Sequence, residues 1–141
     1  MKKSTSNKWS CAVVDDDATM VTVLENYISQ ISKLKLVGSY TDPKEALNKL
    51  GQGQEVDFLF LDIKMEISGL DMARMLRNKI NHIIFITAYK QFALEAFQVH
   101  CDHYLVKPVD FSKFLSAIND VVKRKRRQEI LTAGFESKET Y

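Results

Sequence analysis

The sequence lacks a long hydrophobic run and a rich set of cysteines, and each absence narrows the class of protein. No apolar stretch approaches the roughly 18 residues that a membrane-spanning helix requires, and no secretory signal pattern opens the chain. The chain has two cysteines, Cys11 and Cys101, which we interpret as small buried hydrophobes rather than as a disulfide or a reactive thiol. We therefore expect a reduced, cytoplasmic protein without a membrane partner.

The chain also has little net charge, and that charge is unevenly distributed. Its formal net charge is +2, but residues 1–122 carry 14 Lys or Arg against 15 Asp or Glu, whereas residues 123–141 carry 6 against 3. The excess lies in the basic run 123–127, which is either a nucleic-acid footprint or a solvated helix end, and we favour the helix end. Because no helix-turn-helix pattern is present, we expect no DNA binding by this chain alone.

The 141 residues suffice for one hydrophobic core, and short apolar runs alternate with amphipathic segments along them. This alternation is typical of an α/β fold with a parallel sheet and helices on both faces. The predicted strands are Ser10–Asp15, Leu34–Tyr40, Val56–Asp62, His82–Thr87 and Asp102–Val106. The first, third and fourth contain apolar runs without polar interruption, which predicts central strands buried on both faces.

Five helices are predicted to alternate with these strands. Asp17 begins the first, whose apolar residues recur at helical spacing. Asp42 and Pro43 begin the second, as a capping carboxylate and a proline at the first helical position. The remaining helices are predicted at Gly69–Asn78, Lys90–Val99 and Asp110–Arg126.

Polar side chains follow four of the predicted strands at their carboxyl ends. In an open parallel sheet these ends meet in one crevice, where ligands bind. The residues are Asp15, Asp16, Asp62, Thr87 and Lys107, which Pro108 follows. Three carboxylates in one partly buried place would repel one another, so the cluster calls for a cation. Oxygen-only ligands favour Mg²⁺ or Mn²⁺ over zinc, since the three histidines show no metal-ligand spacing.

Asp62 is the candidate nucleophile, because a carboxylate at the end of the apolar run Phe58–Leu61 would be a cost without a use. A carboxylate that attacks a phosphoryl donor forms an acyl phosphate, whose added negative charge needs a metal, a lysine and hydrogen-bond donors. Lys107 supplies the ammonium and Thr87 the hydroxyl. Each of these two residues alone is more often an ordinary surface or strand-end residue, but together with the acidic cluster they favour a phosphoryl site.

Four motifs stand in order along the chain, and a fifth feature follows the third of them. They are Val13-Val14-Asp15-Asp16-Asp17, Phe60-Leu61-Asp62-Ile63-Lys64-Met65, Phe85-Ile86-Thr87-Ala88-Tyr89 with the following Ala93-Leu94-Glu95-Ala96-Phe97, and Asp102-His103-Tyr104-Leu105-Val106-Lys107-Pro108. These motifs resemble the receiver domains of bacterial two-component response regulators, most closely the subgroup joined to LytTR-type DNA-binding domains.

The resemblance implies a flavodoxin-like (βα)5 fold, a doubly wound sheet of five parallel strands in the order 2-1-3-4-5. The receiver domain would span residues 9–126, between a flexible N-terminus at 1–8 and a linker or tail at 127–141. That tail is too short to form a DNA-binding domain, so we expect that the chain is truncated and that it controls transcription through an absent output domain. A stand-alone phosphorelay receiver is the alternative.

By the same resemblance, Asp62 accepts a phosphoryl group from a sensor histidine kinase. The chain would catalyse only its own phosphorylation and dephosphorylation. Asp16, Asp62 and the backbone carbonyl of Lys64 would bind Mg²⁺ (or Mn²⁺), and Asp15 would hold the ion through a water molecule. Phosphorylation would then drive dimerisation through the face formed by the fourth helix, the fifth strand and the fifth helix.

The resemblance also assigns roles to residues at the ends of the fourth and fifth strands. Thr87 and Tyr104 would be the switch residues, one binding the phosphoryl group and the other turning toward the space that the moving loop leaves. Lys107 would pair with the phosphoryl group, and the Lys107–Pro108 peptide bond would be cis.

The loop after Asp62 departs from the family pattern. Met65 is followed by Glu66 where the family usually has proline, and Gly69 lies one residue closer to Asp62 than usual. We therefore expect intact metal ligands and a re-routed loop.

Two other classes of protein compete with a phosphorylated switch. An aspartate-nucleophile phosphatase usually has a second aspartate where this chain has Lys64, which counts against a hydrolase. A receiver-like interaction module that is never phosphorylated usually lacks an acidic residue, the threonine or the lysine, and this chain has them all.

Lys64 and Tyr89 are expected to flank the path of a water that attacks the acyl phosphate.

Overall fold

A computed structural model describes residues 8–139, and for residues 134–139 it describes the backbone alone. The predicted flexible N-terminus at 1–8 therefore lies, apart from Lys8, outside the described residues. The chain divides into two compact units, Met1–Val109 and Asp110–Tyr141. Each unit is described below by itself.

The first unit contains a five-stranded sheet with the strand order β2-β1-β3-β4-β5, in which all neighbouring strands are parallel. The strands are β1 Trp9–Val14, β2 Leu34–Tyr40, β3 Val56–Leu61, β4 Ile80–Thr87 and β5 His103–Val106. The helices of this unit are α1 Ala18–Ser29, α2 Pro43–Gln52, α3 Gly69–Met75, the 3-10 turn η1 Lys90–Phe92 and α4 Ala93–Gln98. The predicted α/β class and strand order are confirmed.

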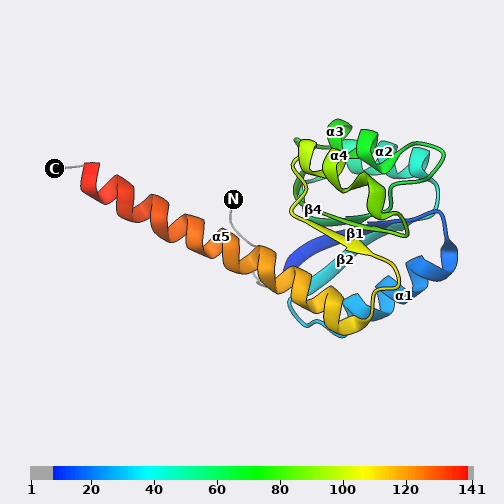
Figure 1. Cartoon of the computed structure of the whole chain (residues 1–141), viewed down its shortest axis with the longest axis horizontal. Helices are drawn as coiled ribbons and strands as arrows, with labels where there is room; N and C mark the ends of the chain where they lie inside the picture. Colours follow the sequence, from blue (N-terminus) through cyan, green and yellow to red (C-terminus); the bar gives the residue numbers. More distant parts are fainter. Residues whose placement is uncertain (1–7, 140–141) are drawn as a thin grey trace. The chain divides into compact units, whose positions relative to one another are not determined.

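The sheet is covered on both faces. Figure 1 shows α1 on one face and α2, α3 and α4 on the other. Alternate residues of the central strands join the helices of the second face in one apolar cluster, among them Ala12, Val14, Leu59, Leu61 and Phe85. The intervening strand residues are buried as well, as the period of two along a strand requires. The uninterrupted apolar runs of the sequence therefore belong to strands with two dry faces.

Side-chain caps fix where three helices begin. The carboxylate of Asp17 accepts a hydrogen bond from the backbone N–H of Thr19, and the carboxylate of Asp42 accepts one from Lys44. These caps satisfy donors that a helix leaves free in its first turn. Ser68 caps α3 in the same way. The predicted starts of the first two helices are thus confirmed, and α3 begins at Gly69 as expected.

Two helices are shorter than predicted. The third helix ends at Met75 rather than Asn78, because the chain tightens into a turn in which the N–H of Lys79 donates to the carbonyl of Leu76. The fourth is a 3-10 turn followed by six α-helical residues. The guanidinium of Arg77, in the turn after α3, donates to two carbonyls just after α4 and so holds that end in place.

The edge strand β2 contains a bulge. Its pairing with β1 is regular up to Cys11 and Leu36, and it then shifts so that Ala12 pairs with Gly38. The extra residue is Val37, which is exposed. An inserted residue of this kind bends the strand and interrupts its hydrogen-bond ladder.

The second unit consists of α5, which runs from Phe111 to Glu139. Its buried residues Phe114, Ala117, Ile118 and Val121 recur at spacings typical of one helix face. The prediction that this helix ends at Arg126 and gives way to a loose tail was wrong. Strong helix formers occupy most of 123–131, and no glycine or proline interrupts them.

The two cysteines differ in burial, since Cys11 is buried and Cys101 is partly exposed. Within the described residues the two cysteines form no disulfide, and Cys11 is fully buried in β1. Burial raises the pKa of the Cys11 thiol to about 12, so it is an inert core residue rather than a reactive thiol. Over the part of the chain that the structure describes, no helix combines the length and apolar character needed to span a bilayer.

Candidate metal and phosphoryl site

Backbone pairing brings the carboxyl ends of the strands to one edge of the sheet. The N–H of Asp62 donates to the carbonyl of Val14 over 3.0 Å, which sets the end of β3 beside the end of β1. The N–H of Lys107 donates to the carbonyl of Thr87 over 2.8 Å, which does the same for β5 and β4. Residues from four segments far apart in the sequence therefore share this edge, as the parallel topology predicts.

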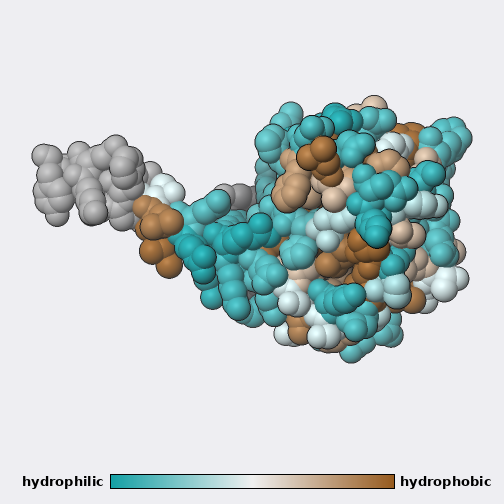
Figure 2. Space-filling model, in the orientation of Figure 1, coloured by the Kyte–Doolittle hydropathy of each residue, from teal (hydrophilic) through white to brown (hydrophobic). Residues whose placement is uncertain are grey.

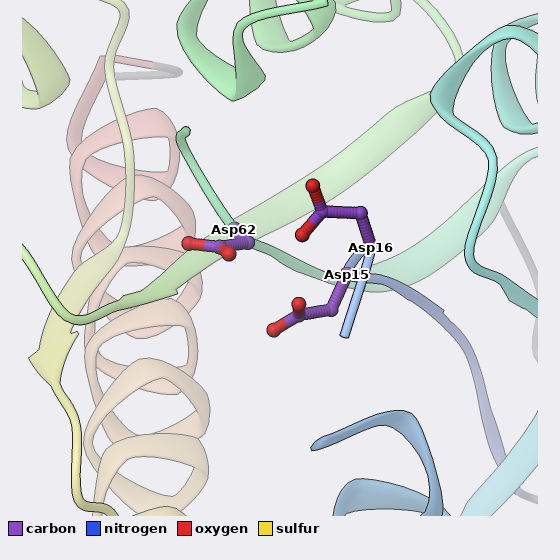
Figure 3. A group of neighbouring side chains, drawn as sticks. All are labelled: Asp15, Asp16 and Asp62. Atoms are coloured by element: carbon purple, nitrogen blue, oxygen red, sulfur yellow. The ribbon is translucent and has the colours of Figure 1, made fainter. Parts of the chain in front are cut away.

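Three carboxylates converge there. Asp15, Asp16 and Asp62 each offer an oxygen such that these atoms lie within 4.8 Å of one another, and Figure 3 shows the three side chains around one space. Asp15 is 1 % exposed and Asp62 is 8 % exposed, whereas Asp16 is open to solvent. The predicted acidic cluster is confirmed as a set of neighbours with one open side.

One ammonium group, that of Lys107, forms ion pairs with two of these carboxylates. Lys107 Nζ lies 2.8 Å from Asp15 Oδ2 and 3.5 Å from Asp62 Oδ2. Burial lowers the pKa of Lys107, but the hydrogen bond to Asp15 and the charges of Asp62 and Asp15 outweigh burial, so its pKa is raised overall. The lysine is therefore positively charged at neutral pH and holds the two aspartates together.

The pKa of Asp15 is raised above its ordinary value. Burial raises it, and the nearby charge of Asp62 adds to that rise. The hydrogen bonds from Lys107 and from the backbone N–H of Asp17 lower it only in part. The carboxylate thus carries an electrostatic cost that a further cation would relieve.

The charges and donors of this cluster fit a divalent metal. The cluster holds three carboxylates against one ammonium, and every candidate ligand atom is a carboxylate oxygen. Oxygen ligands with one open side suit Mg²⁺ or Mn²⁺, which keep waters and accept a phosphate oxygen. Asp15, Asp16 and Asp62 could hold such an ion. The carbonyl of Lys64, in the loop after Asp62, stays a predicted ligand.

The Asp62 carboxylate is oriented by its own loop. Its Oδ1 accepts a hydrogen bond of 2.7 Å from the N–H of Ile63, while its Oδ2 faces Lys107. Two donors thus approach the two oxygens of one carboxylate, and they leave lone pairs free for a metal or for attack on an electrophile.

The predicted switch residues lie on the neighbouring strands β4 and β5, and both contact the loop after β4. Thr87 is fully buried at the end of β4 and accepts a hydrogen bond from the N–H of Tyr89, with 3.4 Å between the nitrogen and the hydroxyl oxygen. The hydroxyl of Tyr104, on β5, donates to the carbonyl of Tyr89. The loop after β4 is therefore bonded both to Thr87 and to Tyr104. The Lys107–Pro108 peptide bond is cis.

The loops after β3 and β4 also contact each other. The ammonium of Lys64 lies 4.8 Å from the centre of the Tyr89 ring, a distance typical of a cation–π interaction. Sequence reasoning placed these two residues beside the acyl phosphate but gave no sign that they contact each other. No spacing rule could give it, because the two side chains are long, exposed and on different loops.

The shortened loop returns to Asp62 through Gly69. The N–H of Gly69 donates to the carbonyl of Ile63 over 2.8 Å. A Cβ added at Gly69 would lie 1.9 Å from the carbonyl oxygen of Asp62, a separation that no real contact permits. Gly69 is therefore a residue on which the position of the nucleophile depends, and sequence reasoning identified it only as the loop glycine.

The sequence matches a protein-family model along most of the chain. A family model described as the response regulator receiver domain matches residues 11–119. The chain belongs to this family. The predicted receiver identity is thus confirmed, and the acidic cluster, Thr87 and Lys107 lie within the matched range.

Several relatives have known names. The chain is 34 % identical over 114 residues to the sensory transduction protein LytT of Enterococcus faecalis, covering 79 % of this chain and 47 % of LytT. It is 30 % identical over 120 residues to the transcriptional regulatory protein BtsR of Escherichia coli, covering 84 % of this chain and 50 % of BtsR. The chain therefore spans about half the length of these relatives.

A solved structure extends the likeness to three dimensions. The response regulator TrrA of Thermotoga maritima, solved in complex with Mg²⁺ and BeF, is 28 % identical and superposes with a TM-score of 0.68. The similarity covers 80 % of this chain and 98 % of TrrA. The receiver fold is therefore shared over nearly the whole of TrrA.

The contact between Gly69 and Asp62 predicts a sharp difference between two glycines. We expect Gly69→Ala to lower the free energy of unfolding by about 1–3 kcal/mol, because the new methyl group meets the backbone of Asp62. Gly51→Ala in α2 is the matched control, since a Cβ there has no neighbour within 4 Å; it should leave stability unchanged or raise it by up to about 1 kcal/mol. Urea unfolding measures both, and equal stabilities for the two variants would contradict the proposed steric role.

Proposed function

We propose that this receiver domain is a phosphorylation switch in which Asp62 accepts a phosphoryl group from a sensor histidine kinase with the help of Mg²⁺. The observation that carries the proposal is the arrangement of Asp62 at the sheet edge, 3.5 Å from the Lys107 ammonium and within the three-carboxylate cluster. The cluster supplies a candidate nucleophile, a cation beside it and candidate ligands of a metal. The chain would act in the cytoplasm.

In the proposed reaction a carboxylate oxygen of Asp62 attacks the phosphorus of a phosphohistidine. The new O–P bond forms as the P–N bond breaks, and the electron pair of that bond returns to the imidazole. The transferred group brings negative charge, which Lys107 is placed to meet. A bound Mg²⁺ would supply further charge neutralisation. Asp15 would keep Lys107 oriented through their 2.8 Å contact.

The chain would catalyse only this phosphorylation and its own hydrolytic reversal. Water attacks the acyl phosphate, which restores the Asp62 carboxylate and releases inorganic phosphate. No second aspartate follows Asp62 at the position of Lys64 to serve as the acid or base of a phosphoesterase. This supports a single-turnover switch over a hydrolase of external substrates.

The switch itself would work through the loop after β4. The Thr87 hydroxyl accepts a bond from Tyr89 but has its own proton to donate. Donation to a phosphoryl oxygen would draw the loop toward Asp62, and the bond from Tyr104 to the Tyr89 carbonyl would have to break or follow. Contacts that differ between the two loop positions are what couple phosphorylation to shape.

The output would be dimerisation, followed by control of transcription through a domain that this chain does not contain. Two large apolar side chains of α4 support a docking face, since Leu94 is 68 % exposed and Phe97 is 73 % exposed. Val106 of β5 adds a third exposed apolar residue. LytT and BtsR, which are about twice as long, support a following output domain.

Phosphorylation is tested by the intact mass of the chain after incubation with acetyl phosphate and Mg²⁺. We expect a gain of one phosphoryl group, about 80 Da, that is lost on chelation of the metal and in Asp62→Asn. Asp57→Asn is a matched control, because Asp57 lies at the opposite end of β3 and should still allow the gain. A chain that gains no mass under any condition would point instead to an interaction module that is never phosphorylated.

The contact between Lys64 and Tyr89 predicts a long phosphorylated lifetime. In Tyr89→Ala we expect hydrolysis of the acyl phosphate to be several-fold faster, because water would lose a bulky barrier on its path. Tyr89→Phe keeps the ring above Lys64 and should retain the native rate. Loss of the mass increment with time measures each lifetime. The same rate in Tyr89→Ala and the native chain would mean that the ring serves packing or a partner.

Dimerisation is tested by gel filtration with and without beryllofluoride and Mg²⁺. We expect the native chain to elute as a monomer without the phosphoryl mimic and as a dimer with it. Phe97→Ser should stay monomeric, because it removes an apolar contact from the α4 face. Met75→Ser is the matched control, since Met75 is 66 % exposed but lies on α3. Identical monomers in both conditions would rule out this output.

A further inference from the structure

A basic segment of α5, residues Lys123–Arg127, is exposed within a continuous helix. Its five consecutive residues are Lys or Arg, and the last buried residue before it is Val121. We expected a solvated helix end here, but the helix continues to Glu139. Because each residue turns the helix by about 100°, the five cations are distributed around its whole circumference. Figure 2 shows a largely hydrophilic helix surface before the grey end, interrupted by one hydrophobic spot.

The charges of the basic segment are poorly neutralised by the helix itself. Asp120 and Glu129 are the only acidic residues that lie three or four positions from a residue of the segment. Several basic residues of the segment are themselves three or four positions apart, a spacing at which like charges on a helix repel. Arg124 donates to the carbonyl of Asp120. In the described part of the chain, Lys123, Lys125, Arg126 and Arg127 have no carboxylate within ion-pair distance. A negatively charged partner would therefore relieve a repulsion that the chain leaves in place.

The segment also holds the charge excess of the whole protein. Residues 1–119 carry 14 basic and 14 acidic residues, so they are neutral, whereas residues 120–129 carry 5 basic and 2 acidic residues. The electrostatic attraction for a polyanion is thus concentrated on a short length of one helix.

We infer that the basic segment binds the phosphate backbone of duplex DNA without regard to sequence. Cations on every side of a helix do not converge on one small anion, but they can meet a regular array of phosphates from several directions. This inference rests on the proposed function in one respect, that the output is transcriptional. The segment would then add phosphate contacts to those of the absent output domain and help to set its position on the duplex. It revises our expectation that this chain alone does not bind DNA.

The test is the fluorescence anisotropy of a labelled duplex of arbitrary sequence, titrated with the whole chain at several NaCl concentrations. The logarithm of the binding constant should fall linearly with the logarithm of the salt concentration. The slope should be negative and no steeper than about −4.5, since each phosphate contact contributes about −0.9. Absence of binding at the lowest salt concentration would overturn the inference.

Two variants that lose the same amount of charge distinguish an effect of the basic segment on DNA affinity from an effect of net charge. The first replaces Lys123, Lys125, Arg126 and Arg127 with Gln, and the control replaces Lys33, Lys35, Lys49 and Lys113, all exposed, with Gln. Glutamine has a helix propensity close to that of lysine and arginine, and circular dichroism checks that both variants fold. We expect at least a tenfold loss of affinity in the first and less than a threefold loss in the control. Equal losses would overturn the inference.

Two further measurements distinguish a failure of this inference from a failure of the proposed phosphorylation, and DNA from other polyanions. The mass gain with acetyl phosphate should be the same in both variants and in the native chain, so loss of DNA binding with an intact mass gain would disprove this inference alone. Competition with polyglutamate tests the choice of partner. If polyglutamate displaces the duplex at an equal concentration of charge, the segment binds acidic chains in general, and the assignment to DNA is wrong; weak competition supports it.

Discussion

The contact of one ammonium group with two carboxylates is the interaction on which the site depends. Lys107 lies 2.8 Å from Asp15 and 3.5 Å from Asp62, so it joins the ends of β5, β1 and β3. Without it, two buried carboxylates would face each other with no compensating charge, a severe cost in a poorly solvated place. With it, the cluster keeps a negative charge that suits a divalent ion. The parallel sheet makes this contact possible, because it alone brings these distant residues to one edge.

Most of the fold and the acidic site could be predicted from the sequence, because both follow from local rules. Apolar runs without interruption predict strands with two buried faces, and Asp17 and Asp42 stand at the helix starts that they cap. Strand topology then places every strand-end residue at the same edge. For that reason one site could be assigned to Asp15, Asp62, Thr87 and Lys107. These residues are far apart in the sequence, and only the fold brings them close together in space.

What could not be predicted depends on contacts between loops or on the absence of a stop signal. The contact of Lys64 with Tyr89 joins two exposed side chains whose loops have no common sequence pattern. The steric role of Gly69 depends on how a shortened loop returns to Asp62, which only coordinates can show. The end of α5 was misplaced because a run of like charges was taken as the end of a helix, whereas lysine and arginine are themselves good helix formers.

The bulge in β2 has a consequence for the behaviour of the protein at high concentration. β2 is an edge strand, and edge strands with regular, unpaired backbone groups can recruit strands from other molecules. The extra residue at Val37 puts the backbone groups of β2 out of step with a straight incoming strand. The exposed apolar side chain of Val37 thus lies on an irregular edge. We expect this irregularity to hinder the addition of a strand from another molecule at the β2 edge of the sheet.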